Sequence, residues 1–126
     1  MTRQALATLL WSSTVSRDDG DDFVPADAYN ASAGLVEFIS NQLDQFIEQL
    51  PDDFDPEDHW IGYSSEPSWD ASDQLAHDYI LTRNHHGAGF WDGGWAEPAA
   101  SMLTKLAHQK SEIEVYLNDN DEIEAL

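Results

Sequence analysis

The stretch NASAGLVEFISNQLDQFIEQLP, residues 30–51, decides the fold that the sequence predicts. Its large apolar side chains recur every three or four residues, which places them on one side of an α-helix. Asn30 or Ser32 can cap the first N–H groups of this helix, and Pro51 ends it because proline cannot donate the next intrahelical hydrogen bond. We therefore expect an amphipathic helix over residues 30–50. Its apolar side consists of Leu35, Phe38, Ile39, Leu43, Phe46, Ile47 and Leu50.

The opposite side of this helix and the segment that follows it are acidic and carry no Lys or Arg. Residues 51–60, PDDFDPEDHW, come directly after the helix C-terminus, where the helix dipole is also negative. Such crowding of like charge opposes folding, so this region is the best candidate for an acidic surface that serves a partner. The carboxylates expected to contact that partner are Asp44, Glu48, Asp52, Asp53, Asp55, Glu57 and Asp58.

On the N-terminal side of the helix the pattern is less regular. Residues 4–15 fit a short helix that leads into a strand. Residues 16–29 combine carboxylates with a glycine and a proline, which is typical of a solvated loop. We expect three apolar side chains to attach this loop to the core, namely Phe23, Val24 and Tyr29.

On the C-terminal side we expect a shorter helix over 65–76, followed by a β-hairpin. Residues 77–84, HDYILTRN, form a β-rich alternating run that predicts a strand, and GFWD at 89–92 is expected to return as its partner after a glycine turn. A helix over 96–109 and a terminal hairpin over 112–126 complete the chain. The sum is a small α+β domain spanning 1–126, with helices packed on a short, mostly antiparallel sheet.

The composition limits the possible classes of protein. A chain of 126 residues fits one domain, and 41% hydrophobic residues are enough for a core. No cysteine is present, which excludes disulfides and thiolate chemistry. No apolar run is long enough for a transmembrane helix, and no signal peptide is recognisable, so we expect a cytoplasmic protein without a membrane partner.

The net charge of −20 is the strongest numerical feature of the chain. No Lys or Arg occurs between Arg17 and Arg83. Such a field repels nucleic acids and anionic membranes and favours a basic partner. Three explanations stay open: a surface that only promotes solubility, adaptation to high salt, and imitation of a nucleic-acid backbone by carboxylates placed where phosphates would lie.

Residues 81–95, LTRNHHGAGFWDGGW, form the most unusual stretch. The glycines lack the G-x-G-x-x-G spacing and the Walker lysine of nucleotide-binding loops. Nearby imidazoles and carboxylates resemble zinc ligands, although their spacing matches no metal motif and adjacent strand residues point to opposite faces. No serine or cysteine nucleophile motif is present, so we assign no catalytic residue, metal or cofactor. The ligand candidates are His77, Asp78, His85, His86 and Asp92.

A structural turn accounts for this stretch better than chemistry does. We expect Arg83 to pair with a carboxylate such as Asp92, which would fix the local geometry. Asn84 tolerates the left-handed conformation of a turn. The aromatic side chains are then expected to cover the core or the sheet edge; they are Phe90, Trp91 and Trp95.

The chain resembles a family of small uncharacterised bacteriophage and prophage proteins. The resemblance rests on LWSS at 10–13 followed by an acidic DD run, and on HDYILTRNHHGAGFWDGGW at 77–95. His85 stands where the family usually has glycine, and Gly93 where it commonly has arginine. The resemblance implies a phage origin, hence the host cytoplasm, and no mechanism. The family motif falls on Thr82, Arg83, Asn84, His86, Gly87, Gly89, Phe90, Trp91 and Asp92.

These observations favour a non-enzymatic phage protein that binds and inhibits a basic host protein. The target would be a DNA-binding restriction, CRISPR-type or repair factor, and the carboxylates would imitate DNA. One alternative is a metal-dependent hydrolase centred on His77, His86 and Asp92, and another is a small scaffold or virion-associated component. The sequence leaves the target and the oligomeric state open.

Overall fold

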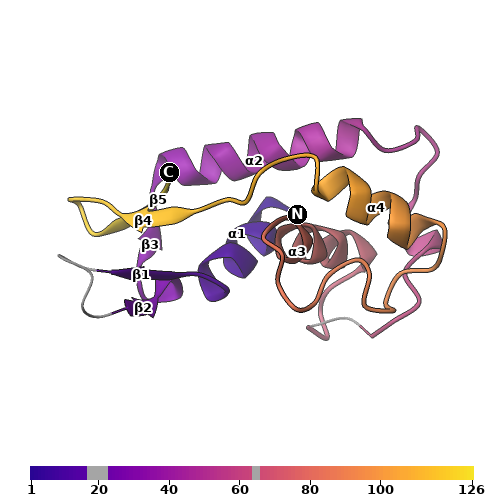
Figure 1. Cartoon of the computed structure of the whole chain (residues 1–126), viewed down its shortest axis with the longest axis horizontal. Coiled ribbons are helices and arrows are strands. Elements are labelled where there is room, and N and C mark those ends of the chain that lie inside the picture. The colour runs from indigo at the N-terminus through magenta and orange to yellow at the C-terminus, as the bar shows by residue number, and fades with distance from the viewer. Residues whose placement is uncertain (17–22, 64–65) are drawn as a thin grey trace.

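The computed structural model describes residues 1–16, 23–63 and 66–126. The strands gather at one end of the molecule, and α2 runs along it toward α4 (Figure 1). The helices are α1 (Thr2–Trp11), α2 (Ala33–Glu48), α3 (Ala71–Arg83) and α4 (Ala99–Ala107), with short 3₁₀ turns η1 (Ala26–Ala28) and η2 (Pro56–Asp58). The strands are β1 (Thr14–Ser16), β2 (Phe23–Pro25), β3 (Asn30–Ala31), β4 (Val115–Leu117) and β5 (Glu122–Ala125).

The strands form two small sheets that are mostly antiparallel, as the sequence predicts. β1 and β2 pair antiparallel, while β5 lies between β3, which is parallel to it, and β4, which is antiparallel. The terminal hairpin of β4 and β5 is closed by Asn118, whose side-chain oxygen accepts hydrogen bonds from the backbone N–H of Asn120 and of Glu122, each at 2.9 Å. The expected α+β fold is confirmed, with its sheet divided into two parts.

Helix α2 confirms the prediction for residues 30–50 with slightly narrower bounds. Ser32 is the cap, and its Oγ accepts a hydrogen bond from the Leu35 N–H at 3.0 Å, whereas Asn30 belongs to β3. The helix ends at Glu48, before Pro51. Its predicted apolar side faces the core, since Leu35, Ile39, Leu43 and Phe46 are buried and the remaining three positions are half-buried.

Residues 77–84 are not a strand, and this prediction is wrong. They continue α3, whose start is fixed by a capping box in which the side chains of Asp70 and Asp73 each accept the other residue's backbone N–H. Ten of the thirteen residues in this helix are buried, so no single apolar stripe marks it. A short apolar run buried on all sides has the same sequence pattern in a helix and in a strand. The helix predicted over 65–76 begins later, at Ala71, and residue 65 lies outside the described range.

The expected return strand at 89–92 is also absent, because residues 84–98 form turns and bends, with one isolated β-bridge between Trp95 and Trp60. Phe90 is nevertheless fully buried, and its backbone N–H donates to the Thr82 Oγ1 at 2.9 Å. A Cβ on Gly89 would collide with that Thr82 hydroxyl. Glycine is required here because the chain passes so closely over α3.

Residues 17–22 of the loop predicted over 16–29 lie outside the described range. Ser16 belongs to β1 and residues 23–28 form β2 and η1, so the described part is more regular than the predicted loop. Val24 and Tyr29 pack against the core as expected, but Phe23 is 68% exposed and does not. The predictions of a helix leading into a strand over 4–15, a helix over 96–109 and a terminal hairpin are confirmed by α1 and β1, by α4, and by β4 and β5.

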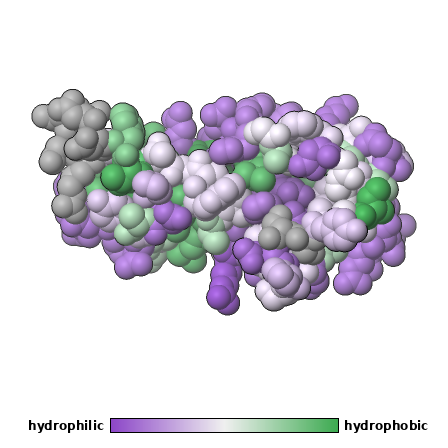
Figure 2. All heavy atoms as spheres, turned by 90° about the horizontal axis from the view of Figure 1, so that it is seen from below, coloured by the Kyte–Doolittle hydropathy of each residue, from purple (hydrophilic) through white to green (hydrophobic). Residues whose placement is uncertain are grey.

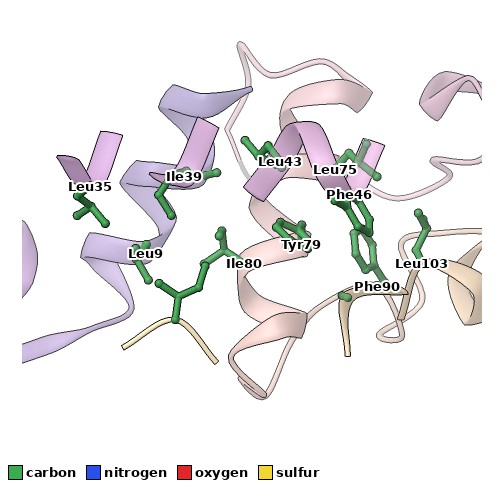
Figure 3. Packing of buried hydrophobic residues seen from close by; sticks show 14 of the residues in the cluster. Leu9, Leu35, Ile39, Leu43, Phe46, Leu75, Tyr79, Ile80, Phe90 and Leu103 are labelled. Atoms are coloured by element: carbon green, nitrogen blue, oxygen red, sulfur yellow. The ribbon is translucent and has the colours of Figure 1, made fainter. Parts of the chain in front are cut away.

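The core lies between α2 and the helices α1, α3 and α4 (Figure 3). Its centre is a group of aromatic rings. The Phe46 ring stacks on Tyr79 and on Phe90, with ring centroids 4.3 and 5.9 Å apart, and the Phe90 and Trp95 rings meet edge to face at 5.8 Å between centroids. Large buried rings contribute much apolar area each, so this group holds α2, α3 and the turn at 84–95 together.

Candidate functional site

The seven carboxylates expected to contact a partner are all exposed, and we refer to them as the acidic face: Asp44, Glu48, Asp52, Asp53, Asp55, Glu57 and Asp58. They follow the C-terminal half of α2 and continue through η2. Asp55 has a local role, since its carboxylate accepts a hydrogen bond from the Glu57 N–H at 3.0 Å and so caps η2. In the described part of the chain, no lysine or arginine pairs with any of the seven. Their charge is therefore directed at solvent.

A second feature, missed by the sequence reasoning, is a cavity of about 650 Å³ beside α1 and α3, which we call the aromatic groove. Two indole rings lie near one imidazole: the ring centroids of Trp69 and Trp11 are 5.1 and 6.5 Å from that of His77. The carboxyl-bearing residues Asp27 and Glu66 are exposed and also line it. Among the described residues, its lining is Ala7, Thr8, Leu10, Trp11, Asp27, Glu66, Trp69 and His77.

His77 is held in one orientation within this groove. Its Nδ1 lies 2.7 Å from the Thr8 Oγ1, and that hydroxyl donates its single hydrogen to the Gln4 carbonyl at 2.8 Å. The bond between Thr8 and His77 is thus donated by Nδ1–H, which leaves Nε2 as the acceptor of a neutral ring. Burial lowers the pKa of His77, while the negative charge of Asp92 opposes this to a smaller extent. The groove therefore contains a neutral imidazole at pH 7.

The structure does not bring together the residues that the sequence suggests as metal ligands. The His86 Nε2 lies 3.2 Å from the Ser12 carbonyl, and the Asp92 carboxylate accepts a hydrogen bond from the Gly89 N–H at 3.3 Å. His85 takes the left-handed conformation, with φ of 55°, and its ring stacks on His108 at 4.5 Å. Among the residues that the structure describes, no three His, Asp or Glu side chains are grouped as metal ligands.

Asp78, one of the ligand candidates of the sequence, instead forms a buried polar site with two hydrogen-bond donors of the protein. It is 5% exposed and accepts hydrogen bonds from the Trp95 Nε1 at 2.7 Å and from the Gln74 Nε2 at 3.1 Å. Burial raises the pKa of its carboxyl from 3.8 to about 6, although the two hydrogen bonds counteract part of that rise. The site ties the centre of α3 to the turn at 84–95, because its donors come from both segments.

Arg83 does not pair with Asp92, which corrects the sequence prediction. It is buried and donates to three neutral acceptors: the Gln42 Oε1 at 2.7 Å, the Ser111 carbonyl at 2.8 Å and the Tyr79 hydroxyl at 2.9 Å. These partners come from α2, from α3 and from the segment before β4. The guanidinium thus joins three parts of the fold by hydrogen bonds rather than by an ion pair.

The other polar residues of the 82–92 stretch have comparable structural roles. Asn84 has φ of −92° and is not the left-handed residue of the turn; its side chain exchanges two hydrogen bonds with the Ile113 backbone, at 2.7 and 3.2 Å. Thr82 is fully buried. Phe90 and Trp95 are buried in the core as expected, whereas Trp91 is 53% exposed. The motif therefore fastens the end of α3 to its surroundings, and the DD run of the resemblance at 18–19 lies outside the described residues.

The surface opposite α2 has a mixed character. Hydrophilic side chains cover most of this face, and hydrophobic ones form small separate patches (Figure 2). None of the helices in the described ranges combines the length and the apolar character needed to cross a bilayer.

Comparisons of the chain with models of protein families, with curated proteins and with solved structures found no match.

Proposed function

We propose that this protein binds a basic protein through the acidic face and blocks the surface with which that protein binds nucleic acid. The observation that carries the proposal is the exposure of all seven carboxylates in a region where no cation of the described chain is paired with them. The overall charge of −20 adds long-range attraction for a basic partner and speeds the encounter.

The acidic face resembles a nucleic-acid backbone in that it presents a series of negative charges. Duplex DNA presents about one negative charge per 1.7 Å of its axis, and a groove that accommodates DNA is lined by Lys and Arg. Carboxylates along α2 and η2 offer such a groove a series of acceptors on a rigid support. The resemblance to phage proteins makes a host restriction, CRISPR-type or DNA-repair factor the first partner to test, with the host cytoplasm as the site of action.

The test is binding to a panel of purified host restriction, CRISPR-type and repair proteins, at about 50 mM and about 200 mM salt, with duplex DNA as competitor. The variant changes Asp52, Asp53 and Asp58 to Asn and keeps Asp55, because Asp55 caps η2. We expect salt-sensitive binding that DNA displaces. We also expect at least about tenfold weaker binding by the variant, since exposed charge contacts contribute about 0.5 kcal/mol each.

A matched control removes the same charge elsewhere, by changing Glu112 and Glu114 to Gln and Asp119 to Asn. All three side chains are exposed and lie near the terminal hairpin, away from the acidic face in sequence. This control should bind nearly as well as the original chain. Equal losses in both variants would mean that net charge alone drives binding, and no loss in either would exclude the acidic face.

A further inference from the structure

The aromatic groove lies outside the acidic face, and the proposed function does not use it. Trp11 is 63% exposed although it borders a concave site. Tryptophan in such a position is typical of the residues that dominate binding energy in protein interfaces. A cavity of about 650 Å³ is within the size range of ligand sites and has room for a complete side chain with its adjoining backbone.

The side chains that line the groove favour a cationic occupant. Indole faces attract cations through the negative potential above the ring, and Trp does so more strongly than other aromatic residues. Asp27 and Glu66 supply two carboxylates to the same groove, and none of the described residues that line it is a Lys or Arg. The nearby Arg3 borders an adjoining hollow that shares Ala7 and Trp69 with the groove. An anionic ligand would meet two like charges here.

We infer that the aromatic groove binds one arginine side chain of a partner protein, with its guanidinium against Trp11 and Trp69 and its N–H groups directed at Asp27 and Glu66. Arginine fits better than lysine because its planar guanidinium stacks on aromatic rings, donates in a fixed fork and is more weakly hydrated. His77 is compatible with this occupant, since burial lowers its pKa and the neutral ring does not repel a cation.

The test uses the whole chain and N-acetyl-arginine amide as the probe, followed by NMR of the indole N–H signals. The neutral isostere N-acetyl-citrulline amide and the equally charged N-acetyl-lysine amide are the comparison probes. We expect saturable shifts at Trp11 and Trp69 with the arginine probe, and at least about fivefold weaker binding of the other two, in line with a cation–π and carboxylate contribution of about 1 kcal/mol or more.

Two variants and a matched control complete the design. Trp11→Ala should weaken arginine binding about tenfold, whereas Trp91→Ala, which removes another exposed indole, should leave it unchanged. The double change Asp27→Asn with Glu66→Gln should weaken it severalfold, and because both side chains are exposed it also tests the groove if Trp11→Ala does not fold.

Equal binding of arginine and citrulline would overturn the inference, and so would equal binding of lysine or an unchanged affinity in Trp11→Ala. The variant of Asp52, Asp53 and Asp58 should bind the arginine probe like the original chain. Because the probe requires no host partner, failure of the proposed function and failure of this inference give different results.

Discussion

The end of α3 and the acidic face place charge in opposite ways. Arg83 is buried and donates to three neutral acceptors, while the seven carboxylates of the acidic face are exposed and pair with no cation of the described chain. An ion pair would normally satisfy a buried guanidinium in such an acidic protein. Neutral hydrogen bonds and aromatic packing, and not ion pairs, hold the end of α3. Carboxylates serve the fold as local caps, at Asp70 and Asp73 for α3 and at Asp55 for η2, while the rest of the acidic face is left available for a partner.

The largest expected effect comes from Arg83→Ala, which removes the hydrogen bonds of this buried guanidinium. The change leaves the Tyr79 hydroxyl, the Gln42 amide oxygen and the Ser111 carbonyl without their donor, and it creates a cavity among three segments. We expect a loss of about 3–5 kcal/mol in the free energy of unfolding, measured by urea denaturation.

The same substitution at Arg3, which is exposed on α1, is the control and should change stability by less than about 0.5 kcal/mol. If Arg83→Ala costs no more than Arg3→Ala, the hydrogen bonds of Arg83 do not join the segments as we infer.

A smaller effect is expected from Asp78→Asn, and it depends on pH. Because burial raises the pKa of Asp78 from 3.8 to about 6, the folded chain binds this proton more strongly than the unfolded chain. The stabilisation is complete below about pH 3.8 and is lost as the pH rises through about 6, which amounts to on the order of 3 kcal/mol. Asn cannot ionise, so the variant should gain that much relative to the original chain between pH 4 and pH 7.

Urea denaturation of both proteins over this pH range gives the difference between their unfolding free energies at each pH. Contributions of other titrating groups that the two proteins share cancel in this difference. His77 is one of these: its lowered pKa means that stability is lost as the pH falls below 6.5, the opposite direction. A pH-independent difference between Asp78→Asn and the original chain would contradict the prediction.

Sequence reasoning succeeded where structure is determined by neighbouring residues. The apolar spacing from Leu35 to Leu50, the cap at Ser32 and the Asn118 turn are local patterns, and α2 and the terminal hairpin follow from them. The exposure of the acidic face follows in the same way, since its residues alternate with the buried side of α2 or lie in the segment after it.

Sequence reasoning failed where residues that contact each other are distant in the chain. The acceptors of Arg83 include residues 28 and 41 positions away, and a nearby carboxylate was the simplest partner that the sequence offered. Helix α3 is surrounded by other elements, which hides its period. The aromatic groove combines residues of α1, η1 and α3, so no single stretch marks it. One local signal was available: the spacing of Asp70 and Asp73 fits a capping box at the start of α3.

The smallest effect on stability is expected at the acidic face. Changing Asp52, Asp53 and Asp58 to Asn relieves repulsion near the negative C-terminus of α2, so we expect a gain of about 0.5 kcal/mol in unfolding free energy at low salt, measured by urea denaturation. The gain should disappear at high salt, because the charges are exposed and salt screens them. A loss of more than about 1 kcal/mol would instead give these carboxylates a structural role. Stability that rises while partner binding falls is the result that separates charge kept for recognition from charge required for folding.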